Sequence, residues 1–374
     1  TCWIQVNGLK KNSYAYIYNI DGKIKVADPM AELVLDPWND AWVNRENFTD
    51  LPAYPTGKTN GIVSVFTLGK TAYPWKNSTF EIKNPSALNI YELHIRDFIE
   101  SRDYETLIDT LNYIKSMGIN AIELMPIGEF EGNNSWGYGP SFHMAVDKYY
   151  GNENQLKEFI DICHGEGIAV ILDMVLNHAF GQSSHCRMYW DANNNRPSTD
   201  NPWLNPVAKH DFNVGYDYNH ESSSTAKFVK QVLHHWLTEF QFDGFRFDLS
   251  KGFTQKNTLG NTGAWGQLDN SRIAIWKRIR DEIREYDKNA VLILEHFADN
   301  DEEKVLSKEG FLIWGNANHE YNEATMGYTS DLSWGSNYKS RGWSEPNLVS
   351  YMESHDEERL MYKNLQYGNS NGNY

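Results

Sequence analysis

The chain has 374 residues, more than one ordinary domain needs, which suits either two domains or one large α/β barrel. Its 50 acidic and 34 basic residues give a net charge of −16, so nucleic acid and anionic membrane surfaces would repel it. Aromatic residues make up 14% of the sequence, which suits a rich hydrophobic core or a ligand with flat, weakly polar faces. The composition therefore argues against nonspecific nucleic-acid or membrane binding and favours a globular protein with a large core.

The sequence also lacks the signals of several other classes. No apolar run approaches the roughly 18 residues that a membrane helix needs, so no transmembrane segment is expected. The start shows no basic and then apolar signal segment, and the abrupt opening at Thr1 suggests a mature or trimmed chain. Three scattered cysteines are too few for a disulfide framework or a zinc knuckle: Cys2, Cys163 and Cys186.

The first part of the chain is predicted to be a small all-β unit followed by an irregular segment. Turn signals of the Asn-Gly and Asp-Gly type separate short alternating runs at 3–6, 14–18 and 23–26. From Asp28 to Pro85 the sequence is rich in Pro, Asn and Trp and shows little periodicity. We therefore predict an N-terminal domain over residues 1–85, with its second half irregular and packed against the next domain.

From residue 89 onward, apolar strands alternate with amphipathic helices. The predicted strands are 90–95, 121–125, 169–175, 244–247, 291–294, 311–314 and 348–352. The predicted helices are 104–117, 154–164, 224–240, 272–286 and 301–308. This alternation predicts repeated βα units and a parallel sheet buried on both faces. A doubly wound sheet would carry a Gly-rich phosphate turn after its first strand, and because residues 94–97 lack one, a barrel is favoured.

The predicted fold is a (β/α)8 TIM barrel over residues 86–374. Only seven strands are found, and 18 residues remain after Asp356, so we expect the last βα unit to be missing from a cut chain. A polar insertion at 179–223 separates the third predicted strand from the helix that follows it.

Polar side chains follow four of the predicted strands, at the barrel end where catalytic residues gather. Any one of them could be structural; Asp248 and Arg246, for example, could simply form an ion pair. Their convergence at successive strand ends instead predicts a functional site. The set consists of Asp173, Asn177, His178, Arg246, Asp248, Glu295, His355 and Asp356.

Glycosidic-bond cleavage explains this combination of side chains. Cleavage with retention needs a carboxylate nucleophile and a second carboxyl about 5–5.5 Å away. Neighbouring strands lie about 4.8 Å apart, so Asp248 and Glu295 can meet that distance. Arg246 is expected to hold Asp248 ionised, and partial desolvation is expected to raise the pKa of Glu295 toward that of a general acid. Three further residues would contact the sugar: Asp356, His178 and His355.

The segments that carry these residues resemble the four signature regions of the α-amylase family, glycoside hydrolase family 13. The segments are 173–178, 244–248, Glu295 and 353–356, and the resemblance extends from about Asn89 to Asp356. It implies Asp248 as nucleophile, Glu295 as acid/base and Asp356 as the carboxylate that binds the distorted sugar. It also implies substrate contacts from Trp136, Tyr138, His178, Arg246, Lys251 and His355.

The resemblance extends to the parts outside the barrel core. The N-terminal unit resembles the small, carbohydrate-binding-module-like β-sandwich that precedes the barrel in branching and debranching members, and it looks truncated. The insertion at 179–223 stands where the family places domain B. No cofactor is needed for the chemistry. Asn177 matches a family calcium ligand, but Lys251 is followed by Gly252 where calcium-binding members have His, which weakens the case for a structural calcium ion.

Residues and resemblance together predict a retaining enzyme that hydrolyses α-1,4-glucans such as starch, glycogen or maltooligosaccharides, in the manner of a bacterial α-amylase. Two alternatives stay open: a branching or transglycosylating enzyme with the same carboxylates, and a catalytically silent starch-binding relative. A metal-dependent barrel hydrolase is a more distant possibility. An acidic, aromatic-rich polysaccharide enzyme with a trimmed start fits an exported protein better than a cytoplasmic one.

Overall fold

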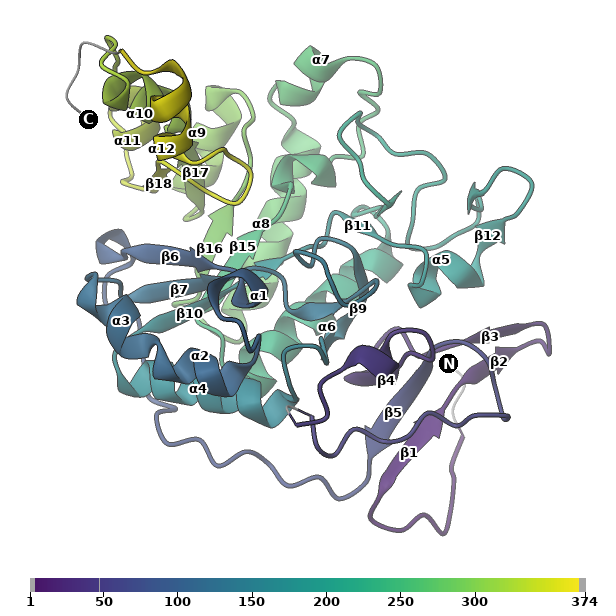
Figure 1. The fold of residues 1–374 in the computed structure, drawn as a ribbon. Coiled ribbons are helices and arrows are strands. Elements are labelled where there is room, and N and C mark those ends of the chain that lie inside the picture. The colour runs from purple at the N-terminus through teal and green to yellow at the C-terminus, as the bar shows by residue number, and fades with distance from the viewer. Residues whose placement is uncertain (1–3, 47, 370–374) are drawn as a thin grey trace.

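The computed structural model describes residues 4–46 and 48–369, and an all-parallel sheet forms its centre (Figure 1). The sheet has seven strands in the order β18-β17-β16-β15-β10-β7-β6, so neighbours in the sheet are also successive in the chain apart from short intervening hairpins. The strands are β6 (Ile90–Leu93), β7 (Ala121–Leu124), β10 (Ala169–Met174), β15 (Gly244–Phe247), β16 (Val291–Leu294), β17 (Leu312–Asn316) and β18 (Leu348–Tyr351). This confirms the predicted parallel βα architecture.

Both faces of this sheet are buried, as the continuous apolar runs predicted. In β10, Val170 and Leu172 pack into the large core beneath the helices. Ala169 and Ile171, which point the other way, belong to a smaller apolar cluster on the inner face. The alternation explains why a strand with no polar residue in its first half is stable at this position.

The sheet curls, but its two edge strands do not pair within the described residues. The turn after β18 nevertheless reaches the first strand, because the His355 backbone N–H donates to Glu92 Oε2 in β6 at 2.8 Å. The fold is therefore an incomplete (β/α)8 barrel, an open, curled sheet of seven strands.

Amphipathic helices cover the outer face of the sheet. The helices that match the predicted ones are α2 (Tyr104–Asp109), α3 (Leu111–Ser116), α4 (Glu153–Gly165), α6 (Ser223–Glu239), α8 (Asn270–Arg284) and α9 (Asn300–Lys308). Asn152 begins α4 with a capping box that includes Gln155. The single helix predicted at 104–117 is in fact two, because the chain bends at Thr110, whose hydroxyl bonds back to the Leu107 carbonyl at 2.7 Å.

Several short elements were not predicted, because segments of three to eight residues carry too little periodicity. The helices are α1 (Ile95–Phe98), α5 (Ser184–Met188), α7 (Thr262–Gly266), α10 (Asn318–Thr325), α11 (Ser333–Ser336) and α12 (Leu360–Tyr367). The 3-10 turns are η1 (Asp40–Trp42), η2 (Pro85–Ala87) and η3 (Ser250–Phe253). No helix among the described residues is both long and apolar enough to cross a membrane.

The N-terminal unit, residues 4–85, contains a three-stranded antiparallel sheet and a hairpin (purple in Figure 1). Its strands are β1 (Ser13–Tyr16), β2 (Tyr18–Ile20), β3 (Ile24–Val26), β4 (Leu33–Leu35) and β5 (Val63–Thr67). The predicted turn at Asp21-Gly22 is confirmed: both residues have positive φ, 53° and 69°, and join β2 to β3.

Two predictions for this unit are wrong. Residues 4–6 of the predicted first strand are not a strand, and Trp3 lies outside the described residues. The segment 28–85 is not irregular throughout, because it supplies β4 and β5. In β5, Val65 pairs with Ala15 in β1, fifty residues earlier, and so distant a partner leaves no local signal.

A buried hairpin and an insertion project from the barrel. The hairpin, β8 (Gly128–Phe130) with β9 (Pro140–Val146), follows β7 and was not predicted. The insertion, residues 179–223, contains α5 and continues from β11 (His178–Ala179), which pairs with β14 (Tyr216–Asp217); β12 (Trp190–Asp191) pairs with β13 (Arg196–Pro197). In Figure 1 the insertion lies above the N-terminal unit, and Ser184 Oγ donates to the Ala27 carbonyl at 2.6 Å.

Candidate active site

Arg246 forms the centre of the polar cluster at the carboxyl ends of the strands. Its side chain is fully buried, and its Nη1 lies 2.9 Å from Asp173 and 3.2 Å from Asp248. Its Nη2 lies 3.1 Å from Glu295 Oε2, and its guanidinium carbon is 4.2 Å from the centroid of the Trp314 ring. One guanidinium therefore holds three carboxylates that come from three neighbouring strands.

The strand register explains this arrangement. Arg246 in β15 lies directly opposite Asp173 in β10. On the other side, Phe247 lies opposite Leu294 in β16, so the next residues along these strands, Asp248 and Glu295, are neighbours. The parallel sheet thus brings the two predicted catalytic carboxyls together at one end.

Burial controls the protonation of this pair. It raises the pKa of Asp248 to about 8; the charge of Glu295 adds to the rise, and Arg246 opposes it. Burial also raises the pKa of Glu295, against the charge of Arg246 and the Leu249 N–H, which donates to Oε2 at 2.7 Å. The expectation that Arg246 holds Asp248 ionised is therefore wrong as stated, because burial outweighs the charge of Arg246. Burial favours the protonated form of both carboxyls, and Arg246 favours their ionised form.

Tyr138 lies beside the cluster on the loop between β8 and β9. Its hydroxyl donates to Asp173 Oδ2 at 2.6 Å. Its ring stacks on the His355 ring, with centroids 4.9 Å apart and planes 21° apart. The preceding Gly137 has a φ of 96°, and a Cβ there would lie 2.2 Å from the Pro126 carbonyl oxygen. Only glycine fits this close approach, which sets the path of the loop.

His178 takes a different position from the one expected. Its Nε2 donates to the Tyr138 carbonyl at 2.8 Å, and its Nδ1 faces Asn177 Nδ2 at 3.4 Å. The residue is 1% exposed, and burial lowers the pKa of His178 to about 4, so the ring is neutral. Both ring nitrogens face protein groups, so the structure shows His178 supporting Tyr138 rather than offering a donor to a sugar.

Glu92 and Glu123 are two carboxyls that the sequence analysis missed. His355 Nδ1 donates to Glu92 Oε1 at 2.7 Å. Burial alone would lower the pKa of His355, but the hydrogen bond and charge of Glu92 raise it to about 9. Glu123 is opposite Glu92 in the register and 2% exposed, and its burial raises its pKa well above the usual value. A glutamate inside an otherwise apolar strand was the available signal.

Three of the predicted residues lie at the rim of the cluster. The Asp356 side chain is 60% exposed and lies 3.5 Å from His355 Nε2. Trp136 is 42% exposed and donates from Nε1 to Asp97 at 3.3 Å. Lys251 Nζ donates to the Phe297 carbonyl at 2.7 Å and lies 4.0 Å from the Trp265 ring centroid.

The surroundings of Asn177 test the implied calcium ion. Asn177 Oδ1 is buried without a hydrogen-bond partner, which leaves one oxygen available. A Cβ on Gly252 would lie 2.0 Å from that oxygen and 2.8 Å from His210 Nε2, so an imidazole, not a carboxylate, is its neighbour. Calcium takes six to eight oxygen ligands, and the described residues contain no cluster of three His, Cys, Asp or Glu side chains. Asn177 Oδ1 by itself does not make a calcium site, and the calcium ion stays a prediction.

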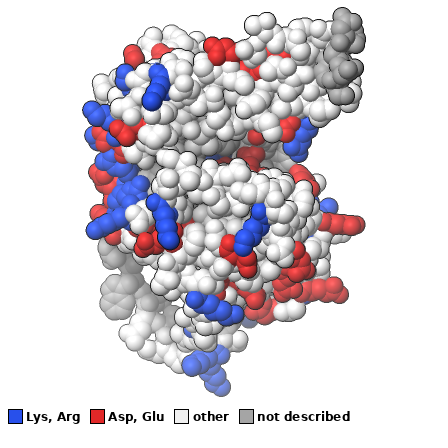
Figure 2. Space-filling view, turned by 90° about the vertical axis from the view of Figure 1, so that its left-hand side faces the viewer, with Lys and Arg blue, Asp and Glu red and all other residues white. Residues whose placement is uncertain are grey.

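The surface agrees with an uncharged ligand. Figure 2 shows acidic and basic side chains interspersed over one face of the molecule, with acidic ones in the depth of a hollow across its middle. This face carries no continuous basic stripe of the kind that binds nucleic acid.

Part of the chain resembles a known protein family. A family model described as the catalytic domain of alpha amylase matches residues 96–214. This segment of the chain is similar to the α-amylase family. It holds Trp136, Tyr138, Asp173, Asn177 and His178. The other site residues lie beyond it, and geometry places them: Arg246, Asp248, Glu295, His355 and Asp356.

Curated relatives within the family have several activities. A malto-oligosyltrehalose trehalohydrolase of Saccharolobus solfataricus is 31% identical over 202 residues, covering 54% of this chain and 32% of the relative. A 1,4-alpha-glucan branching enzyme of Aliivibrio fischeri is 29% identical over 245 residues, covering 60% of this chain and 33% of the relative. The chain thus spans about a third of the length of these relatives.

Solved structures share the fold at low sequence identity. The apo pullulanase of Paenibacillus barengoltzii has a TM-score of 0.65 and 18% identity, covering 96% of this chain and 59% of that one. The α-amylase of Geobacillus thermoleovorans, complexed with acarbose, has a TM-score of 0.59 and 19% identity, covering 76% of this chain and 65% of that one. They confirm the fold of this chain.

Proposed function

We propose that the chain carries the active site of a retaining enzyme that acts on α-1,4-glucans. The observation that carries this proposal is the pairing of Asp248 with Glu295 at adjacent strand ends, each within 3.2 Å of a terminal nitrogen of the buried Arg246. Retaining cleavage needs two neighbouring carboxyls of which one is protonated and the other ionised. Burial raises the pKa of both carboxyls, which favours keeping one proton on the pair.

The reaction proceeds by two displacements at one carbon. Asp248 attacks C1 of a glucosyl unit, the bond from C1 to the leaving oxygen breaks, and Glu295 gives that oxygen its proton. The product is a glycosyl ester on Asp248 and an ionised Glu295. Glu295 then takes a proton from water, whose oxygen attacks C1 and releases the sugar with its original configuration.

Other side chains hold the sugar and stabilise charge. Arg246 stabilises the carboxylate charge that moves between Asp248 and Glu295. The Tyr138 ring offers a face for the sugar, and protonated His355 donates a hydrogen bond to a hydroxyl. Asp356, exposed at the rim, turns toward the sugar when it binds.

Hydrolysis of the α-amylase type is the first candidate, and chain transfer is the second. The second is favoured by the 1,4-alpha-glucan branching enzymes among the relatives. Both reactions share the glycosyl ester and differ in whether water or a sugar hydroxyl attacks it. Reducing-end release together with iodine staining of amylose separates them, because a transferase shifts the stain while few ends are released.

Replacing the proposed nucleophile tests the whole assignment. Asp248→Asn keeps the shape of the side chain but cannot form the ester, so we expect turnover of soluble starch to fall roughly a thousandfold. Reducing-sugar release is the measurement. The matched control is Asp301→Asn in α9, an exposed aspartate, which should leave the rate unchanged. Residual activity above a few per cent in Asp248→Asn contradicts the assignment, and an inactive parent chain supports a silent starch-binding protein.

A further inference from the structure

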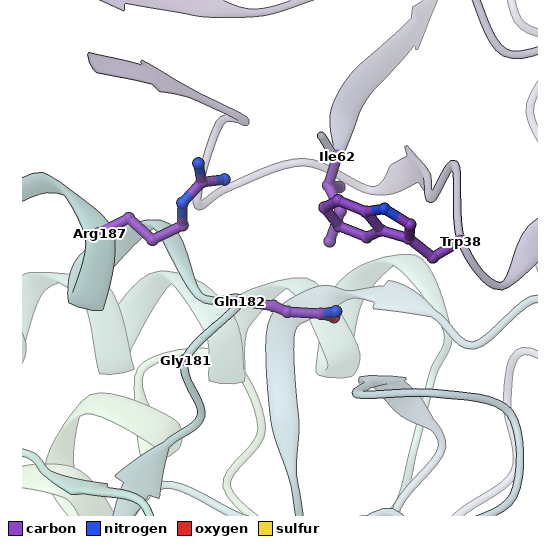
Figure 3. A pocket seen from close by; sticks show the side chains of 5 residues that line it. All are labelled: Trp38, Ile62, Gly181, Gln182 and Arg187. Carbon is purple, nitrogen blue, oxygen red and sulfur yellow. The ribbon is translucent and has the colours of Figure 1, made fainter. Parts of the chain in front are cut away.

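A pocket outside the catalytic cluster lies between the N-terminal unit and the insertion (Figure 3). Its volume of about 440 Å³ is within the range of small-molecule pockets. Figure 3 shows the Trp38 indole and the Arg187 guanidinium on opposite sides of the gap, with the Gln182 amide below them. Ile62 and Gly181 complete the lining. These five residues are distinct from every residue of the candidate active site.

Trp38 presents an open aromatic face on a pre-ordered turn. The residue is 57% exposed. Its backbone N–H donates to Asp36 Oδ1 at 2.8 Å, and Asn39 Nδ2 donates to Asp36 Oδ2 at the same distance. The Asn39 carbonyl in turn accepts from Asn133 Nδ2 at 2.8 Å. Because the turn is fixed before any ligand arrives, a ligand that stacks on Trp38 loses little free energy to ordering it.

The facing wall supplies hydrogen-bond donors. The side chains of Arg187 and Gln182 make no hydrogen bond or ion pair with another described residue, although the protein carries a net charge of −16. The Gln182 backbone N–H donates to Glu131 Oε1 at 2.7 Å. Glu131 lies two residues before Asn133, so one loop of the barrel holds both walls of the pocket.

This combination of groups matches one side of a sugar ring. A pyranose has a face of C–H groups, which the negative face of an indole attracts, and an edge of hydroxyls that accept hydrogen bonds. The guanidinium and the amide provide donors at that edge, and no carboxylate lines the pocket. A nucleic acid could also stack on Trp38, but the net charge of −16 would repel a polyanion.

The pocket borders the active site. Gly181 follows His178 by three residues, so their Cα atoms are at most about 11 Å apart. The loop that holds both walls continues directly to Trp136 and Tyr138. A glucan that occupies the catalytic centre and is long enough to span this distance can therefore also reach the pocket.

We propose that this pocket is a second glucan-binding site, in which a glucosyl unit stacks on Trp38 and bonds through its hydroxyls to Arg187 and Gln182. The inference rests on the proposed function for its choice of ligand. The site holds a part of the glucan that is not cleaved and so raises the affinity for long chains over short ones.

Calorimetric titration of the full chain in an Asp248→Asn background tests this proposal without turnover. The ligands are maltoheptaose and maltotriose, and the variants add Trp38→Ala, Trp38→Phe or Trp42→Ala. Trp42 is the matched control. It lies four residues after Trp38 and is 76% exposed, but it does not line the pocket. Circular dichroism checks that each variant is folded.

We expect Trp38→Ala to weaken maltoheptaose binding about tenfold and maltotriose binding not at all, with Trp38→Phe keeping most of the affinity. The proposal is overturned if Trp38→Ala binds maltoheptaose as tightly as its parent does. It is also overturned if Trp42→Ala loses as much affinity as Trp38→Ala, or if the parent does not bind maltoheptaose. Starch turnover by the chain with intact Asp248 is measured separately. If the chain does not turn over starch but its maltoheptaose binding depends on Trp38, the proposed function is contradicted and the second binding site is still supported.

Discussion

The chemistry of the candidate site depends on single side chains that share one buried charge. Arg246 contacts Asp173, Asp248 and Glu295 through its two terminal nitrogens. A lysine could not replace it, because a single ammonium cannot reach three carboxylates from fixed, separated nitrogens. Burial raises the pKa of Asp248 and Glu295, and the rigid cation of Arg246 opposes that rise in both carboxyls.

Glu92 determines the charge of His355 without touching the reacting atoms. It accepts hydrogen bonds from both the ring Nδ1, at 2.7 Å, and the backbone N–H, at 2.8 Å. Since this carboxylate raises the pKa of His355 to about 9, the ring is an imidazolium throughout the neutral range. Glu92 is therefore a positioning residue that fixes both the direction and the protonation of the histidine proposed to contact the sugar.

Removing this charge gives a pH-dependent prediction. In Glu92→Gln, burial acts on His355 without a counter-charge, so its pKa should fall by at least about two units and the ring should be neutral at pH 8. We expect the alkaline limb of kcat/KM on maltooligosaccharides to move to lower pH by a similar amount. NMR titration of the His355 ring is the direct measurement, with His178 as internal control. An unchanged His355 titration rules out this role.

At the scale of elements, the register of β10, β15 and β16 brings the site together. Asp173 faces Arg246 across one strand pair, and the Phe247–Leu294 pair on the other side makes Asp248 and Glu295 neighbours. A shift of one residue would turn each side chain to the opposite face of the sheet. Such a shift would separate the buried Arg246 from Asp173, Asp248 and Glu295, and the loss of these contacts opposes it.

The 3-10 turn η3 packs so tightly on the chain after β10 that it requires glycine. A Cβ on Gly252 would lie 2.0 Å from Asn177 Oδ1, which is itself fully buried. Gly252→Ala should therefore lower the free energy of unfolding by about 1–3 kcal/mol, measured by chemical denaturation. Gly263→Ala in α7 is the control: its Cβ would meet nothing closer than 3.6 Å, so its stability should be unchanged or higher. Equal stability of the two variants contradicts this packing argument.

At the scale of the whole molecule, a buried ion cluster joins the N-terminal unit to the barrel. Lys148 follows β9, is 2% exposed and contacts Glu129 in β8. Its Nζ also lies 3.4 Å from Asp40 in the N-terminal unit. Burial raises the pKa of Glu129 to about 8, with Lys148 opposing the rise. Burial likewise raises the pKa of Asp40, so both carboxylates depend on this lysine.

Lys148→Met tests the junction. It leaves two buried carboxyls without a cation, so we expect a loss of about 3–5 kcal/mol in the free energy of unfolding at pH 8. The loss should shrink toward pH 5, because the raised pKa of these carboxyls lets the folded state take up protons as the pH falls. Lys115→Met, which breaks an exposed pair with Glu166, should cost less than about 1 kcal/mol. Similar losses in both variants, measured by thermal unfolding at each pH, contradict a structural role for the cluster.

Whether a part of the structure could be predicted depends on how far apart its interacting residues lie in the sequence. The seven central strands and the carboxylates after them were predictable, because continuous apolar runs and their polar ends are local patterns. Strand β1 was predicted from its alternating run at 14–18, but β5 was not, since Val65 finds its partner fifty residues away. Glu92 was missed for a similar reason: its partner His355 follows the last strand, and only the curl of the sheet brings them within 2.7 Å.

By itself, the sequence determined the parallel βα architecture and the identity of the two central carboxyls, Asp248 and Glu295, because local periodicity and strand ends suffice for both. The tertiary structure determined the burial, the protonation and the contacts of these groups. It turned His178 toward the Tyr138 carbonyl, divided the charge of Arg246 among three carboxylates, and built the Trp38 pocket from two segments that lie more than a hundred residues apart. Burial, protonation and shared contacts are properties of the packed molecule, since each depends on groups that only folding brings together.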